Sequence, residues 1–300
     1  HLYMMVVRVF FFQAEDGIRV LVRSRGLGDV YKRQILLCGL VVKFDDLNPA
    51  SKTGNVPVIG EVIPSRWAFE ALAVSSYMYN PYMKHFFEDE KEKFRAQYYR
   101  LGFLEELQSQ METAQDEYIK QNAMDPQRLR VITGGMPRLA EVTGLEPFTY
   151  PVDSWSAELY EALDDYFKQA DKVLSGNSLH YTHAIDRVNR NLLEETGREG
   201  LLELKKNNHN LFLQDLVLNT SSTRMYRLVD HVIVPRVGQI YLEPSTRDGR
   251  APFYSHMKIL GSWKMPTLWY NLGVLGLMAL LTSLALFLEI PARFMRKKST

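Results

Sequence analysis

The chain has 300 residues, and its 36 Lys and Arg nearly balance its 35 Asp and Glu, which leaves a formal net charge of +1. This balance gives no argument for nucleic-acid binding, so no nucleic-acid partner is expected. The mean hydropathy of −0.20 is that of a soluble protein, so any membrane-spanning part must be concentrated in a short stretch. The single cysteine, Cys38, excludes an intramolecular disulfide.

The first 34 residues are interpreted as a sequencing artefact. The chain begins with His1, and the stretch FFFQAEDGIRVLVRSRGLGDVYKRQ, residues 10–34, resembles the translation of a sequencing-library adapter. The alternative is a signal-like N-terminus, but charged residues interrupt its apolar stretches, which is wrong for the apolar region of a signal peptide. We therefore assign residues 1–34 no function.

Two apolar segments follow. Residues 35–45 begin with ILLCGLVV, which is too short to cross a bilayer, so we interpret them as the outer end of a truncated transmembrane helix. A buried strand or core helix of a soluble domain fits the periodicity equally well. Residues 46–82 are predicted to form a re-entrant or interfacial segment, with a helix that starts at Pro64 and Ser65. Its aromatic residues suit the water–lipid boundary: Trp67, Tyr77, Tyr79 and Tyr82.

Residues 83–262 are predicted to be one largely helical domain. Apolar residues recur at helical spacing over residues 86–121, which predicts a long amphipathic helix. Further helices are predicted over residues 154–174, 179–196 and 200–219, because Gly, Pro or Asn, which favour helix ends and turns, lies at their boundaries. The predicted fold class is therefore mainly α, and the domain has the size of one ordinary domain.

The run from Thr267 to Ile290 is the clearest membrane-spanning segment, within a final transmembrane helix at residues 263–291. As a helix it would reach about 36 Å, enough to cross a hydrocarbon core of about 30 Å. Its strongly polar residues, Asn271 and Glu289, are expected to reach water near an interface. The predicted interface anchors are Trp263, Trp269 and Tyr270 at one end, and Arg293, Arg296, Lys297 and Lys298 in a basic tail, residues 292–300, at the other.

The positive-inside bias places that basic tail in the cytoplasm. Residues 83–262 are then expected to lie outside the cytoplasm, and the chain to be an integral protein of a cell membrane, such as the bacterial inner membrane. Membrane lipid is therefore an expected partner.

Several segments together resemble the membrane half of an ATP-binding-cassette (ABC) exporter of the type-two permease class, as in G-subfamily transporters and their bacterial relatives. The most specific segment is IPSRWAFEAL, residues 63–72, which is similar to the family's element after the fifth transmembrane helix. The segment GQIYLEPSTRDGRAPFYSHMKILG, residues 238–261, is similar to the approach to the final helix in the bacterial branch. The resemblance implies that residues 35–45 end the fifth helix and that the last apolar run is the sixth.

This resemblance implies the permease part of an ATP-driven exporter. Its partners would be the remaining transmembrane helices and the ATPase module of the parent chain, in a dimer of permease halves. The phosphate loop G-x-x-x-x-G-K-[ST] does not occur in the chain, so ATP and Mg would bind the missing module, and no cofactor or catalytic residue is expected in this fragment. The alternative is a single-pass, membrane-anchored extracytoplasmic protein that binds a partner.

A charged pair is the most informative feature of the re-entrant segment. Glu61 and Arg66 are expected to pair and hold its helix in place, because a charge near lipid costs several kcal/mol unless it is paired or reaches an interface. The alternative is a surface arginine whose aliphatic stem lies on lipid. Trp67 and Glu70, from the IPSRWAFEAL segment, complete the set of structural or gating candidates.

Metal and enzyme sites are weakly indicated. His180 and His183 lie three residues apart on a predicted helix, but solvated surface histidines are the commoner explanation of this spacing, so no metal site is expected. The sequence has neither a G-x-S-x-G elbow nor an H-E-x-x-H helix. The fragment is therefore not expected to be an enzyme.

Overall fold

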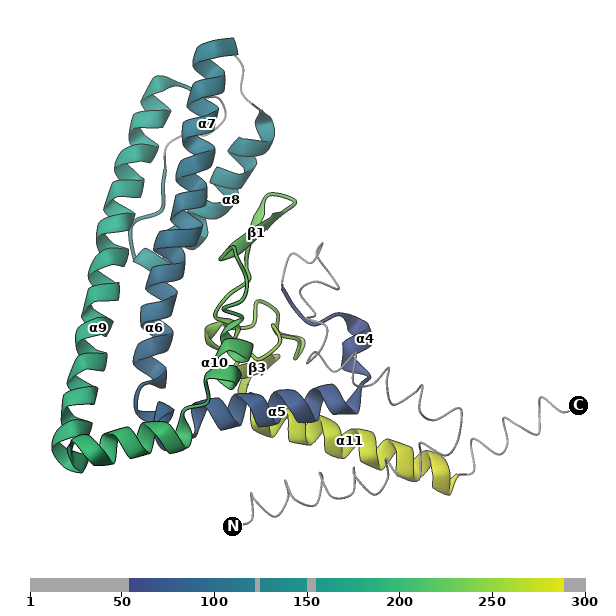
Figure 1. Cartoon of the computed structure of the whole chain (residues 1–300). Helices are drawn as coiled ribbons and strands as arrows, with labels where there is room; N and C mark the ends of the chain where they lie inside the picture. Colours follow the sequence, from purple (N-terminus) through teal and green to yellow (C-terminus); the bar gives the residue numbers. More distant parts are fainter. Residues whose placement is uncertain (1–53, 122–124, 150–154, 289–300) are drawn as a thin grey trace, which may run out of the picture. The chain divides into compact units, whose positions relative to one another are not determined.

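The computed structural model describes residues 54–121, 125–149 and 155–288, and these residues are mainly helical, which confirms the predicted fold class (Figure 1). The chain divides into two compact units. Among the described residues, unit 1 contains 57–69 and 271–288, and unit 2 contains 54–56 and 70–270.

Unit 1 is built from α4 (Val58–Glu61), the first part of α5 (Pro64–Met78) and most of α11 (Thr267–Phe287). α5 begins at Pro64, the predicted start, because proline fits the first turn of a helix, where its missing N–H costs nothing. Within the described residues, α11 is the one helix that is long and apolar enough to cross a membrane, with a mean hydropathy of 1.8. Only 6% of that apolar stretch is buried, unlike a core helix of a soluble protein.

The first helices of unit 2 are the second part of α5 and the short helix η1 (Met83–His85). They are followed by α6 (Phe87–Tyr98), η2 (Tyr99–Leu104) and α7 (Glu105–Gln121). The predicted long amphipathic helix is therefore present as a continuous helical path (Figure 1). η2 is a π-helical turn, which widens the helix locally and changes the faces that α6 and α7 present. The sequence pattern alone did not predict this turn.

α8 (Pro126–Thr143) has clear start and stop signals, although it was not among the predicted helices. Asp125 caps its first turn by accepting a hydrogen bond from the Gln127 N–H at 2.9 Å. Gly144 ends it in the left-handed region with φ of 69°. Pro137 lies inside the helix.

The three helices predicted over residues 154–219 are confirmed only in part. The structure has α9 (Ala157–Asn208), which is bent at Gly197 between the second and third predicted helices, and a short helix, α10 (Leu211–Leu218). The predicted break between residues 174 and 179, and a single helix over residues 200–219, are wrong. Gly176 does not break α9, because an exposed glycine only weakens a helix by about 1 kcal/mol. The real bend is at Gly197, whose φ of 70° and ψ of 171° are not helical.

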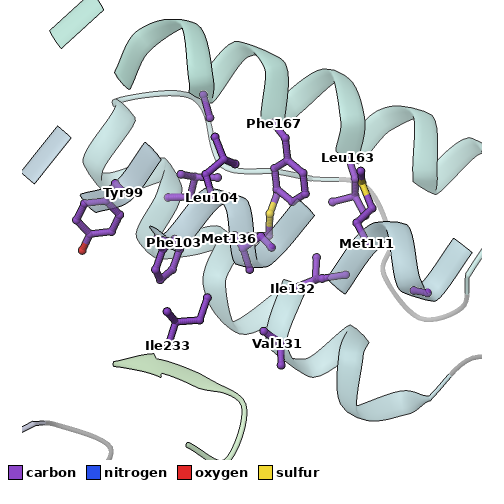
Figure 2. Packing of buried hydrophobic residues seen from close by; sticks show 14 of the residues in the cluster. Tyr99, Phe103, Leu104, Met111, Val131, Ile132, Met136, Leu163, Phe167 and Ile233 are labelled. Atoms are coloured by element: carbon purple, nitrogen blue, oxygen red, sulfur yellow. The ribbon is translucent and has the colours of Figure 1, made fainter. Parts of the chain in front are cut away.

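The hydrophobic core of unit 2 lies between η2, α7, α8 and α9. Figure 2 shows Phe167 pointing from α9 toward Met136 of α8, with Ile233 reaching the cluster from a neighbouring strand. Leu107, Leu163 and Phe167 are fully buried. Each such side chain stabilises the fold by roughly 1.5–3 kcal/mol relative to an exposed position.

Unit 2 also contains two hairpins, which the helical patterns did not predict. β1 (Tyr226–Val229) pairs antiparallel with β2 (Val232–Pro235), and β3 (Met257–Leu260) pairs antiparallel with β4 (Trp263–Pro266). Between them lies the short helix η3 (Gln239–Tyr241). Gly238 precedes η3 with φ of 66°, and a Cβ added there would lie 2.0 Å from the Phe94 ring, so glycine is required at this position.

Candidate functional site

The predicted ion pair between Glu61 and Arg66 is present in unit 1. An Arg66 guanidinium nitrogen (Nη1) lies 3.2 Å from a Glu61 carboxylate oxygen (Oε2). Glu61 ends α4 and Arg66 lies in the first turn of α5, so the short connection at residues 62–63 brings the two charges together. The guanidinium is fully buried, whereas 19% of the Glu61 side chain is exposed.

Trp67 completes this arrangement from the same turn of α5. The Arg66 guanidinium carbon lies 3.8 Å from the centre of the Trp67 ring, which is a cation–π contact. The indole N–H of Trp67 donates to the Glu61 carbonyl at 2.8 Å. Trp67 is 5% exposed, so it is an internal residue of the folded chain and the predicted position at the water–lipid boundary is wrong in the structure.

Asn271 joins α11 to α5 within unit 1. Its side-chain amide donates to the Trp67 carbonyl at 3.1 Å, and the residue is fully buried. The prediction that Asn271 reaches water near an interface is therefore wrong in the structure. A buried amide on an otherwise apolar helix needs a polar partner, and here a neighbouring helix supplies it.

Glu70, the fourth predicted candidate, forms a buried ion pair in unit 2. The Lys258 ammonium donates to the Glu70 carboxylate at 2.6 Å, and both side chains are fully buried. Lys258 lies on β3, which immediately precedes β4 and the start of α11. This partner could not be predicted from the sequence, because Lys258 is 188 positions away and belongs to a hairpin that was not predicted.

The first turn of α11 is fastened to the same region of unit 2. The Thr267 hydroxyl donates to the Ser255 carbonyl at 2.5 Å, and the Thr267 N–H donates to the His256 carbonyl at 3.0 Å. Thr267 is fully buried. These bonds satisfy donors that a helix start leaves without intrahelical partners, and they fix where α11 begins.

A second cluster of buried polar side chains links α5, α6 and η3. Tyr241 donates to the Glu90 carboxylate at 2.8 Å, and the Tyr77 and Tyr241 hydroxyl oxygens lie 3.1 Å apart. Since Tyr241 gives its proton to Glu90, Tyr77 is the donor between the two hydroxyls. Burial raises the pKa of Glu90, and the hydrogen bond from Tyr241 partly offsets this effect. Tyr77 is 2% exposed, so its predicted place at the water–lipid boundary is wrong in the structure.

His256 lies next to this group with one ring nitrogen committed to the backbone. Its Nδ1 is 2.9 Å from the Ile240 carbonyl, and its ring meets Phe87 edge-on. Burial is the main cause that lowers the pKa of His256, and the positive charge of Lys91 adds to it. The carboxylates of Glu243 and Glu88 act in the opposite direction.

This lowered pKa predicts a dependence of stability on pH. The unfolded chain binds a proton at residue 256 at a higher pH than the folded chain does, so the His256 contribution to stability should be lost as pH falls below about 6.5. Thermal unfolding followed between pH 7.5 and 5 checks this. The variant His256→Asn keeps a donor for the Ile240 carbonyl without titrating, so its unfolding midpoint should fall less over this range; an equal fall in both proteins would contradict the assignment.

The predicted membrane-interface anchors can be placed only in part. Trp263, on β4, and Trp269, in the first turn of α11, are strongly exposed, and Tyr270 is half-buried. The basic anchors lie outside the described residues: Arg293, Arg296, Lys297 and Lys298.

The buried ion pairs and hydrogen bonds described above are suited to a structural role, namely to hold helices in place. His180 and His183 are exposed on α9, and within residues 54–121, 125–149 and 155–288 no three His, Cys, Asp or Glu side chains converge as a metal ion would require. The buried polar groups described above are ion pairs and hydrogen bonds between structural elements.

Comparison of the chain with protein-family models, with curated proteins and with solved structures found no match.

Proposed function

We propose that this chain is the C-terminal part of the permease of an ATP-driven, ABC-type membrane exporter. α11 would be its last transmembrane helix, residues 83–262 would form a domain outside the cytoplasm, and the C-terminal tail would lie in the cytoplasm. The ATPase module and the remaining helices would belong to the parent chain, and two permease halves would form the working dimer.

The observation that carries this proposal is the contact between Asn271 of α11 and the Trp67 carbonyl of α5. A helix that serves only as an anchor needs no polar contact with a second helix, because lipid can surround it on all sides. Here α11 donates a buried hydrogen bond to a helix that also holds the buried Glu61–Arg66 pair. Polar contacts of this kind are typical of helices that work together in a bundle.

The exposed surface of α11 gives independent support. Leucines at three helical positions, Leu277, Leu281 and Leu284, are about half exposed. Such a continuous apolar surface is unfavourable in water, but it fits lipid or the missing helices of a permease. In that setting α5 would be the re-entrant helix, and its charged pair would help to hold the external exit in shape.

A labelling experiment tests the topology. Asp116 lies on α7 with 68% of its side chain exposed, so a cysteine there is accessible to a thiol reagent. In a Cys38→Ser background, Asp116→Cys should react with a membrane-impermeant maleimide in intact spheroplasts, whereas Ser299→Cys should react only after permeabilisation. Labelling of position 116 only from the cytoplasmic side would overturn the orientation.

A further inference from the structure

A groove of about 440 Å³ runs along α8 and the loop that follows it. Its volume lies within the range of small-molecule sites in proteins, roughly 300–1,000 Å³. The wall is mainly apolar and includes Met136 from α8 together with Leu145 and Phe148 from the loop. Phe148 is held in place by an edge-on contact with Tyr166 at 5.4 Å between ring centres. An apolar body of modest size therefore fits this groove.

Two residues on one face of α8 give the groove hydrogen-bond acceptors. Thr133, Pro137 and Glu141 line it at intervals of four residues, and so lie on one face of α8. Pro137 has no N–H, so the Thr133 carbonyl loses its intrahelical donor. The Thr133 hydroxyl already donates its proton to the Leu129 carbonyl at 2.8 Å. Glu141 adds a carboxylate. The side chains that line the groove thus offer acceptors and one negative charge, but no uncommitted donor.

Arg138, a cation close to Glu141, makes its hydrogen bond and its ring contact with another residue. Arg138 lies close enough to Glu141 for their charges to interact, yet its Nε–H donates to the Tyr99 hydroxyl at 2.5 Å. The Arg138 guanidinium also faces the Tyr99 ring, at 5.9 Å from its centre. Arg138 does not line the groove, so its guanidinium leaves room for a second cation beside the carboxylate.

We propose that this groove binds an organic ammonium, namely an amine with an apolar body whose N–H groups reach the Thr133 carbonyl and the Glu141 carboxylate. The Glu141 carboxylate disfavours anionic ligands in the groove, because like charges repel. The same groove favours a cation over a neutral molecule of equal shape. This inference concerns unit 2 alone and does not rest on the exporter function.

Calorimetric titration of the purified chain with 2-phenylethylammonium, and with 2-phenylethanol as the neutral comparison, tests the proposal. The amine should bind about two- to fivefold more tightly than the alcohol, since it adds an ion pair with the exposed Glu141 carboxylate. Glu141→Gln should weaken amine binding about two- to fivefold, because the carboxylate is exposed and water screens its charge, and should leave alcohol binding unchanged. The control Glu146→Gln changes an exposed carboxylate in the same loop that does not line the groove, and it should have no effect.

A second variant distinguishes the contribution of the Thr133 carbonyl to amine binding from that of the Glu141 carboxylate. Pro137→Ala returns an N–H to the Thr133 carbonyl, so it should weaken amine binding while raising the thermal unfolding midpoint of the chain. Equal affinity for amine and alcohol, failure of the amine to bind at millimolar concentration, or full amine affinity in Glu141→Gln would each overturn the proposal. No step of the titration requires ATP or transport, so its failure would leave the exporter proposal untouched.

Discussion

Replacing Lys258 by Met should lower the free energy of unfolding by about 3–5 kcal/mol, because the fully buried Glu70 carboxylate would lose its cationic partner. Desolvation makes a buried charge costly, and the lysine at 2.6 Å offsets that cost in the folded chain. The loss should appear as a lower midpoint of chemical or thermal unfolding in detergent solution.

Two comparisons make this prediction specific. The double variant Glu70→Met/Lys258→Met removes both charges, so it should recover most of the lost stability. Lys120→Met removes one partner of an exposed pair, in which the Lys120 and Asp116 side chains are 69% and 68% exposed, and should change the midpoint little. A Lys258→Met effect no larger than that of Lys120→Met would contradict the buried-pair account.

Replacing Arg66 by Ala should lower both the stability of the chain and the amount of folded protein recovered from expressing cells. The change removes a buried guanidinium, its ion pair with Glu61 and its contact with the Trp67 ring, and it leaves a cavity beside the indole. We expect a loss of about 3 kcal/mol or more. Size-exclusion chromatography of detergent extracts measures the folded amount, and thermal unfolding measures the stability.

Lysine is the informative second substitution at this position. Arg66→Lys keeps the charge but loses the planar group that lies over Trp67, so it should restore only part of the stability. Arg95→Ala, at an arginine with 46% of its side chain exposed and 3.9 Å from Glu92, is the matched control and should behave like the unaltered chain. Normal abundance of Arg66→Ala, with normal transport in the full-length protein, would exclude a structural role for Arg66.

The elements that the sequence predicted best are those with strong local signals. The apolar run after Pro266 formed α11, and the helical periodicity of residues 86–121 formed α6 to α7. Glycine alone was an uneven guide to helix boundaries. The break predicted between residues 196 and 200 coincides with the bend at Gly197, but the break predicted near Gly176 is absent because the helix continues through that residue.

The candidate site was predictable only where its partners are close in sequence. Glu61 and Arg66 are five positions apart, so the pattern of charges in an apolar segment was enough to pair them. Lys258, Tyr241 and Asn271 meet α5 from more than 160 positions away, and the fold alone brings them there. Trp67 and Tyr77 were assigned to the lipid boundary because both are aromatic, a property that equally suits a buried site with a hydrogen-bond partner.

The genomic sequence upstream of the codon for Ile35 tests the central proposal most directly. If the chain is the end of an exporter permease, that sequence should encode further apolar spans of about 20 residues and, before them, a G-x-x-x-x-G-K-[ST] phosphate loop. A secretory signal peptide directly before Ile35, with neither of these features, would contradict the proposal and identify a single-pass anchored protein instead.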